Sequence, residues 1–350
     1  MIIDVHGHYT TAPHELRDFR DAQLAGEPAS MAPISDDRLR QSVEDNQLRV
    51  MRERGGDLML FSPKASGMEH HVPDPSVANA WARVSNDMVH RVAKLFPGHF
   101  APVAQLPQTP DGNLSGVLAE VRRTVEEIGF VGVNLNPDPS GTWAGRPMTD
   151  ASWFPVYELL EELDVPAMVH VSTACNPNFH TLGAHYLNAD TSVFTQLLQG
   201  DVFRRFPGLR LVIPHGGGAV PYHWGRYRGL AMRNGWQDPS ALLSNVFFDT
   251  CVYHQPGIDL LLGVLPPGNV LFASEMLGAV RGADPSTGVA WDDTLVYVKD
   301  AGLADEALTD VLTDNALRVY PRLASWVSPA GCARSVSRRP ARRYAAGGPS

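Results

Sequence analysis

Cysteine is scarce in this sequence, and long apolar runs are missing from it. The 350 residues include three cysteines, Cys175, Cys251 and Cys332, without paired spacing. A disulfide framework is therefore not expected, and the composition fits a reducing compartment. No apolar run approaches the roughly 18 residues that a membrane span needs. No stretch of signal-peptide character precedes the first strand-like run, so we expect a cytoplasmic protein with no membrane partner.

Basic residues are outnumbered as well, with 29 Lys and Arg against 38 Asp and Glu and a formal net charge of -9. Five of the arginines follow Ser325, where no acidic residue occurs, so the rest of the chain is more acidic than the whole. Such a surface repels a phosphate backbone, which argues against nucleic acid as a partner. Residues 325–350 lack apolar periodicity, and we expect an Arg-rich disordered tail there, after a single domain at 1–324.

Eight short apolar runs alternate with amphipathic stretches along the chain. Runs of this length, rich in Val, Ile, Leu and Phe, are typical of parallel strands that are buried on both faces. Alternating strands and helices of this size predict an α/β protein with a (β/α)8 barrel. The strands are expected at 2–5, 58–62, 100–106, 131–136, 167–172, 211–215, 246–250 and 270–275. Helices are expected at 36–54, 75–95, 115–128, 153–163, 191–206 and 304–320, and a loop or small subdomain at 9–33.

The end of the first predicted strand carries two histidines, His6 and His8. Residues two apart in a strand point to the same face, so both imidazoles can reach one metal ion. The motif is short, and two ordinary polar histidines at a junction between strand and loop are an equally simple interpretation. The other strand ends decide between these interpretations, because the carboxyl ends of all strands meet at one end of a barrel.

Three more strand ends carry groups of the same kind, namely His170, His215 and Glu275. Nitrogen and carboxylate ligands without thiolate favour zinc, with another divalent ion such as Mn²⁺ as an alternative. We expect the metal ligands to be His6, His8, His170 and Glu275, and His215 to be a proton-transfer group or a further ligand. A metal lowers the pKa of its bound water, so the pattern indicates metal-assisted addition of water or activation of a carboxylate.

These residues resemble the amidohydrolase superfamily, in its branch of aminocarboxymuconate-semialdehyde decarboxylases, resorcylate decarboxylases and 4-oxalomesaconate hydratases. Members have a distorted (β/α)8 barrel, His-x-His after the first strand and histidines after the fifth and sixth. The resemblance runs from Met1 to about Leu323 and ends in NALRVY at 315–320. Relatives often form dimers, so the resemblance allows a homodimer.

One departure from the superfamily pattern is Glu275, since most members place Asp after the eighth strand. With Glu275, four longer segments resemble the 4-oxalomesaconate hydratases: HVSTACNPNFH at 170–180, PHGGGAVPYHWG at 214–225, FDTCVYHQPG at 248–257 and SEMLGAVRG at 274–282. The resemblance implies a hydro-lyase that uses zinc to hydrate 4-oxalomesaconate to 4-carboxy-4-hydroxy-2-oxoadipate, in protocatechuate and gallate ring-cleavage catabolism.

A small polycarboxylate substrate needs cationic and hydrogen-bonding groups at the mouth of the barrel. Lys64 and Arg281 follow the second and eighth strands and are candidate carboxylate ligands, although both could equally be solvated loop charges. The other candidate substrate-binding residues lie in the loops after the fifth and seventh strands: Asn178, His180, Tyr186 and His254. Asp249 is expected to orient a histidine or to cap its own loop. His70 and His71, in the loop after the second strand, could line the mouth of the barrel, but they are expected at the surface.

We expect Glu275 to take a proton from water as hydroxide adds to the C=C bond, and His215 to move the second proton. A metal-dependent, non-oxidative decarboxylase of an aromatic or muconate-type acid remains an alternative from the same branch. A hydrolase is less favoured, because the usual Asp is absent. A non-catalytic metal-binding protein would instead have a closed coordination sphere.

Overall fold

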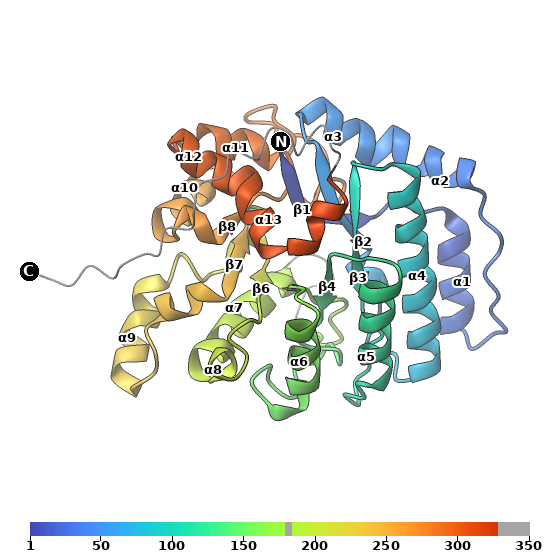
Figure 1. Ribbon diagram of the computed structural model, residues 1–350, viewed down its shortest axis with the longest axis horizontal. Coiled ribbons are helices and arrows are strands. Elements are labelled where there is room, and N and C mark those ends of the chain that lie inside the picture. Colours follow the sequence, from blue (N-terminus) through green and yellow to red (C-terminus); the bar gives the residue numbers. More distant parts are fainter. Residues whose placement is uncertain (179–183, 328–350) are drawn as a thin grey trace, which may run out of the picture.

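The computed structural model describes residues 1–178 and 184–327, and its eight strands form one parallel sheet in the order β1 to β8. Each strand pairs with the next one along the chain (Figure 1). The strands are β1 (Ile3–Tyr9), β2 (Leu58–Pro63), β3 (Phe100–Gln105), β4 (Gly132–Leu135), β5 (Ala167–Val169), β6 (Leu211–Ile213), β7 (Val246–Asp249) and β8 (Val270–Leu271). Each lies within or overlaps a strand expected from the sequence.

Backbone hydrogen bonds join the two ends of this sheet. Val5 N donates to Phe272 O over 3.0 Å, and Glu275 N donates to His6 O over the same distance. These bonds tie β1 to the segment that continues β8. The predicted α/β barrel is thereby confirmed, and Glu275 is held directly beside the histidines of β1.

The strands read as continuous apolar runs because both of their faces are covered. Every strand residue is buried, and successive residues face different clusters. Met168 and Val212 belong to the cluster inside the barrel, whereas their neighbours Val169 and Leu211 pack in the cluster between strands and outer helices. Burial on both faces removes the alternation of polar and apolar residues that a half-exposed strand shows.

The C-terminal helical segment closes one end of the barrel. Val319, Tyr320 and Leu323 belong to the cluster inside the barrel, and Figure 1 shows α13 (Asn315–Val319) lying across the strands. Gly132 in β4 has no Cβ, and one built there would lie 2.9 Å from the Tyr320 ring. With the amino ends of the strands covered in this way, the carboxyl ends are left for a site.

Helices surround the sheet, and several agree with the predicted ranges. Short π-helical turns at Arg123–Glu127 and Asp310–Asp314 continue neighbouring helices, so 115–127 and 305–319 are each one helical stretch. The turn at Glu44–Leu48 is kinked at Asn46, where φ is -125° and ψ is -107°, so the helix expected at 36–54 is two helices joined at a kink. The α-helices are α1 (His14–Leu24), α2 (Asp36–Val43), α3 (Arg49–Arg54), α4 (Pro75–Leu95), α5 (Ser115–Arg122), α6 (Phe154–Glu162), α7 (Ala184–Gln199), α8 (Val202–Arg205), α9 (Trp224–Asn234), α10 (Gln255–Val264), α11 (Thr294–Asp300), α12 (Asp305–Thr309) and α13 (Asn315–Val319).

Two helix expectations were wrong in part. The helix expected from residue 191 begins at Ala184, because its first turns bury His185 and Asp190 and so lack an apolar stripe. The segment 9–33 contains α1, and sequence reading also missed α9, α10 and α11. In α9 only Tyr227 and Ala231 are buried, too few residues to produce a clear helical period.

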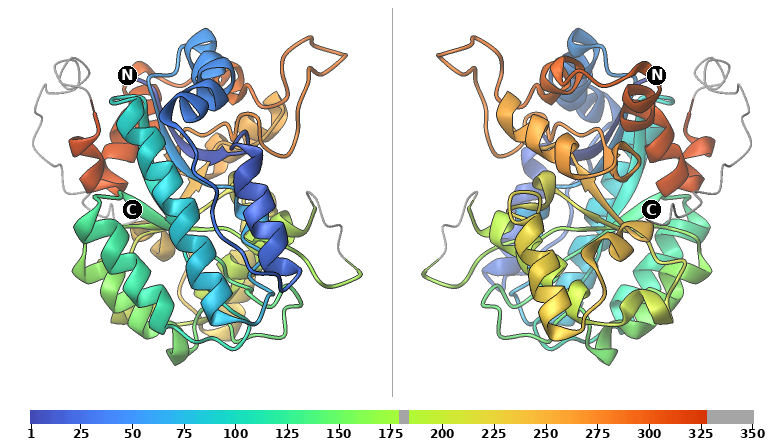
Figure 2. Two further views of the ribbon diagram at one scale, coloured as in Figure 1. Left: turned by 90° about the vertical axis from the view of Figure 1, so that its right-hand side faces the viewer. Right: turned by 90° about the vertical axis from the view of Figure 1, so that its left-hand side faces the viewer.

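Residues 325–327 continue the ordered chain, since Trp326 Nε1 donates to Gly129 O over 2.8 Å. The rest of the expected Arg-rich tail, 328–350, lies outside the described residues. Among the helices that the structure describes, none combines the length and the apolar character needed to cross a membrane. Figure 2 shows the segment after β8 and the described part of the segment after β5, up to residue 178, extending to the same side of the molecule.

Replacing Gly7 with Ala should destabilise the protein by about 1–3 kcal/mol, because a Cβ there would lie 2.8 Å from Leu60 O and would also meet the Met59 side chain. Gly229→Ala in α9 is the matched control: a Cβ there meets nothing within 4 Å, and the change should stabilise by up to about 1 kcal/mol. The measurement is the free energy of unfolding in urea. Equal effects of both changes would contradict the tight pairing of β1 and β2.

Candidate metal centre and active site

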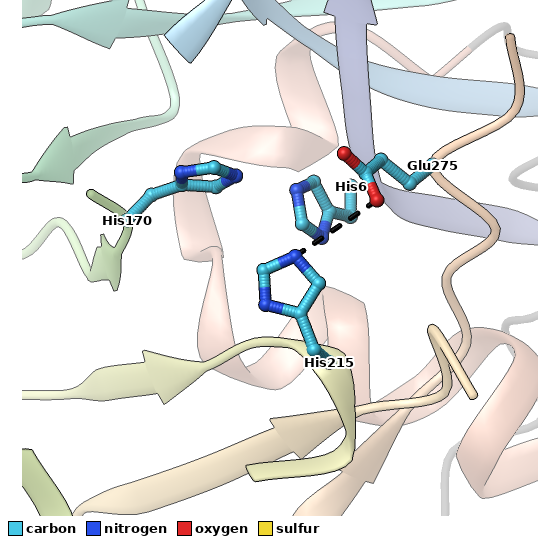
Figure 3. A group of neighbouring side chains, drawn as sticks. All are labelled: His6, His170, His215 and Glu275. Carbon is cyan, nitrogen blue, oxygen red and sulfur yellow. Dashed lines mark ion pairs between the residues drawn. The ribbon is translucent and has the colours of Figure 1, made fainter. Parts of the chain in front are cut away.

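Five buried side chains from four strand ends converge at the carboxyl end of the barrel. His6 and His8 lie in β1, and His170 and His215 each come just after a strand, β5 and β6. Glu275 lies in the segment after β8. Figure 3 shows four of the five, His6, His170, His215 and Glu275, pointing toward one space from separate elements.

The spacing of their polar atoms fits a single metal ion. Nε2 of His8 lies 3.1 Å from Nε2 of His6 and 3.2 Å from Nε2 of His170. Two nitrogens bonded to one tetrahedral zinc lie roughly 3.3 Å apart, given Zn–N bonds of about 2.0–2.1 Å. The ligand atoms of His6, His170, His215 and Glu275 all lie within 4.8 Å of one another, and Glu275 Oε1 is 4.0 Å from His8 Nε2.

The opposite ring nitrogens show which tautomers these histidines adopt. His170 Nδ1 lies 2.8 Å from the carbonyl oxygen of Val171, which can only accept, so Nδ1 carries the proton. His6 Nδ1 is in the same way 2.8 Å from Asp249 Oδ2. With both Nδ1 atoms directed outward, the Nε2 atoms of His6 and His170 face His8 Nε2, and either a proton or a metal ion among the three offsets the repulsion of their lone pairs.

His8 obtains its orientation from Ser62, at 2.8 Å from His8 Nδ1. The Ser62 hydroxyl lies within hydrogen-bonding distance of the carbonyl oxygens of Gly7 and Pro63, so its proton has acceptors there and its oxygen can accept from Nδ1. Asn134 Nδ2 donates to the same oxygen over 3.2 Å. Each of the three histidines thus has an outer partner that leaves Nε2 free for a metal.

Burial and charge give these histidines different pKa values. Burial, followed by the nearby charges of His6 and His170, holds the pKa of His8 well below its ordinary value. Burial and His6 have the same effect on the pKa of His170. Burial would also lower the pKa of His6, but the Asp249 hydrogen bond and the Glu275 charge outweigh it and raise that pKa to about 8. His8 and His170 are therefore neutral at pH 7, whereas metal-free His6 is protonated.

Glu275 lies between the histidine cluster and His215. Its Oε2 accepts a hydrogen bond from Tyr253 over 3.1 Å and lies 3.9 Å from His215 Nε2, while Oε1 is directed toward His8. Both Glu275 and His215 have positive φ, 50° and 53°, a conformation that non-glycine residues rarely adopt. This strained backbone directs both side chains into the site, as is common at functional positions.

The candidate substrate-binding residues are spread over several loops. The Tyr186 ring stacks on His215 at 4.3 Å between centroids. Lys64 is exposed just after β2, and its charge contributes to lowering the pKa of His8. Arg281 is exposed, and its guanidinium donates to Leu277 O over 2.9 Å. Asn178 and His254 are exposed in the loops after β5 and β7, and His180 lies outside the described residues.

Several contacts at the site were not anticipated from the sequence. Asp190 in α7 lies 2.9 Å from His215 Nδ1, and no short motif marks it. Ser62 contacts His8 and Tyr253 contacts Glu275 between neighbouring strands of the sheet or the segments that follow them, although these residues are 54 and 22 positions apart along the chain. His70, expected at the surface, is buried: Nε2 donates to Leu106 O over 2.9 Å, and Nδ1 lies 3.0 Å from Ser172 Oγ. That expectation was wrong because the loop after β2 folds over the ends of β3 and β5.

Asp249 fulfils both roles that were considered for it. Its Oδ2 accepts from His6, and its Oδ1 accepts from the backbone of Gly216 over 3.2 Å and of Cys251 over 3.0 Å. Burial alone would raise the pKa of this carboxyl, but the His6 hydrogen bond lowers it below its ordinary value. Asp249 is therefore ionised, and it links the first histidine to the glycine-rich loop after β6.

Zinc binding at pH 7 should release about one proton from His6, because its pKa near 8 leaves Nε2 protonated in the metal-free protein. The number of protons released on zinc binding should fall as the pH rises through 8, since His6 is then already neutral. Asp249→Asn removes the group that raises the His6 pKa and should reduce proton release at pH 7. Calorimetric titrations in buffers of different ionisation enthalpy measure the difference; equal release by both proteins would contradict this assignment.

Comparisons with known proteins agree with this architecture. The sequence profile of a family described as amidohydrolase matches residues 3–322. A 2-keto-4-carboxy-3-hexenedioate hydratase from Sphingobium sp. is 53% identical over 332 residues, which are 92% of this chain and 97% of that protein. The crystal structure of a 4-oxalomesaconate hydratase from Rhodopseudomonas palustris superposes with a TM-score of 0.86 at 51% identity, covering 93% of this chain and 97% of that one.

A more distant solved structure shares the fold alone. The 5-carboxyvanillate decarboxylase from Sphingomonas paucimobilis has a TM-score of 0.68 at 19% identity and covers 91% of this chain and 98% of that one. The profile match spans nearly all of the described barrel, from β1 to the helical segment that closes it. The chain therefore belongs to the amidohydrolase family.

Proposed function

We propose that this protein is a zinc-dependent hydratase that converts 4-oxalomesaconate to 4-carboxy-4-hydroxy-2-oxoadipate. The observation that carries the proposal is the near full-length similarity, 53% and 51% identity, to two proteins named as hydratases of this unsaturated oxo-tricarboxylate. The position of Glu275 between the histidine cluster and His215 supports it. The reaction would serve protocatechuate and gallate ring-cleavage catabolism in the cytoplasm.

The ligands for the metal would be His6, His8, His170 and Glu275. The three free Nε2 lone pairs and the neighbouring carboxylate fit a divalent ion such as Zn²⁺ or Mn²⁺. When bound, such an ion acts as a Lewis acid and makes water more acidic near neutral pH. His215 is close enough to be a further ligand, but its Nε2 also faces Glu275 Oε2, which supports a role in proton transfer.

Hydration requires one base and one route for a proton to carbon. In the keto form of the substrate, the C3=C4 bond is conjugated with the C2 ketone, so hydroxide adds at C4 and charge develops toward C3 and the ketone oxygen. Glu275 takes the proton from the attacking water, and the hydrogen bond from Tyr253 orients its carboxylate. Glu275 then passes this proton to His215, whose Nε2 is buried beside it, and His215 delivers the proton to C3.

Binding of the three carboxylates would fall to the loops around the site. Lys64 is close enough for its charge to act on His8, and Arg281 lies in the loop that follows Glu275. Tyr186 covers one face of His215 and can donate its hydroxyl to a carboxylate. Asn178, His180 and His254 complete the proposed substrate-binding set, in the loops after β5 and β7.

Glu275→Gln should lower the rate of hydration by about 10²–10⁴-fold, because glutamine cannot accept the proton of water. The measurement is the loss of the conjugated chromophore of 4-oxalomesaconate, with metal content and unfolding free energy determined on the same sample. Glu127→Gln, at an exposed position in the π-turn after α5, is the matched control and should leave turnover unchanged.

Near-normal turnover by Glu275→Gln would refute its role as the base. Loss of metal in this variant would instead identify Glu275 chiefly as a ligand. Release of CO₂ by the wild-type protein from a hydroxybenzoate, without consumption of 4-oxalomesaconate, would favour the decarboxylase alternative over hydration.

A further inference from the structure

The first turns of α7 hold His215 from two directions. Asp190 is buried, and its Oδ2 lies 2.9 Å from His215 Nδ1. The Tyr186 ring stacks on the imidazole at an interplanar angle of 23°. Tyr186 and Asp190 are four residues apart and so lie on one face of the helix. This helical face therefore determines both the plane of the His215 ring and the direction of its Nδ1 atom.

The same helix also fixes the backbone that carries His215. Thr191 Oγ accepts a hydrogen bond from Ala219 N over 2.9 Å. At Gly218, where φ is +60°, a Cβ would lie 2.6 Å from Thr191 Oγ and would collide with Leu187 O. The loop after β6 thus lies against α7 at a distance that only glycine allows. The contact between Asp190 and His215 is part of a tightly packed junction and not an isolated surface pair.

The partner on Nδ1 determines which nitrogen of His215 carries the proton. Burial raises the pKa of Asp190 well above its ordinary value and lowers the pKa of His215 to about 4, so the ring is neutral near pH 7. When Asp190 is ionised, its carboxylate only accepts hydrogen bonds, and Nδ1 then donates its hydrogen to Asp190 over 2.9 Å. In a neutral ring, Nε2 is then unprotonated. Nε2 is buried, has no hydrogen-bond partner among the described residues, and lies 3.9 Å from Glu275 Oε2. Its lone pair is directed into the proposed reaction space.

We propose that Asp190 is a positioning residue that holds His215 in the Nδ1-protonated tautomer, so that Nε2 starts the reaction as a proton acceptor. The consequence for the chemistry rests on the proposed hydratase function. One water O–H bond and the C3=C4 π bond break, while C4–O and C3–H bonds form. Water gives its proton to Glu275, Glu275 passes it to His215 Nε2, and His215 delivers it to C3, so both residues return to their starting states.

A merely structural Asp190 would make a different prediction. If it only anchored α7 to the loop, an asparagine could keep a hydrogen bond in the same place and catalysis would be little affected. If it sets the tautomer, the amide introduced by Asp190→Asn can donate to Nδ1 and move the ring proton to Nε2, which then cannot accept. In other His–Asp pairs, this exchange lowers kcat by about 10⁴-fold without disturbing the fold.

The test compares the zinc-loaded wild-type protein with Asp190→Asn by ¹⁵N NMR of the imidazole nitrogens, with the His215 signals identified by their absence in His215→Gln. We expect protonated Nδ1 in the wild type and protonated Nε2 in Asp190→Asn. With 4-oxalomesaconate, kcat of Asp190→Asn should fall about 10²–10⁴-fold and KM should change less than about threefold. Thr195→Val is the control: it removes only a bond within α7, from Thr195 Oγ to Thr191 O over 2.9 Å, and should keep the wild-type tautomer and kcat.

Protonated Nε2 in the wild-type protein would overturn the proposal, even if Asp190→Asn failed to fold. An exchanged tautomer with near-normal kcat would overturn it as well, as would an equal loss of kcat in Thr195→Val. If the wild type did not consume 4-oxalomesaconate, the proposed function would fail, whereas the tautomer measured by NMR would still decide the role of Asp190.

Discussion

The structure depends on one electrostatic constraint: three imidazole nitrogens meet with their lone pairs facing one another, at 3.1 and 3.2 Å from the central His8 Nε2. Lone pairs at this distance repel, and only a cation or a proton among them makes the arrangement favourable. Burial, followed by the neighbouring imidazole charges, lowers the pKa values of His8 and His170, whereas the Asp249 hydrogen bond and the Glu275 charge raise the pKa of His6, so the positive charge of the metal-free cluster resides on His6. The pattern is that of a site prepared for a divalent metal.

Outer partners keep that cluster in place, and they come from all around the barrel. Asp249 of β7, Ser62 of β2 and the carbonyl oxygen of Val171 each bind one Nδ1 atom. Asp249 also binds the backbone after β6, so the loop of His215 and the ring of His6 are linked through one carboxylate. On the other side of Glu275, Asp190 binds Nδ1 of His215 in the same way as Asp249 binds Nδ1 of His6.

Glu275 lies between the cluster of three histidines and the Asp190–His215 pair. Its two oxygens face different partners, one toward His8 and the other toward His215 and Tyr253. A shorter Asp at this position would withdraw the carboxylate by about one C–C bond, and it would reach one of the two sides less well. In the proposed mechanism, this length lets one carboxylate serve both sides of the site.

The sequence by itself was sufficient to predict the barrel, because eight strands buried on both faces appear as apolar runs. It was also sufficient to find the histidines and the glutamate at the strand ends. It failed for helices such as α9 and the start of α7, where polar or exposed residues mask the helical period. The contact of Asp190 with His215, the contact of Ser62 with His8 and the burial of His70 depend on tertiary structure alone. These contacts join residues 25, 54 and 36 positions apart along the chain, and such pairs acquire a meaning only when the closed sheet brings their elements together.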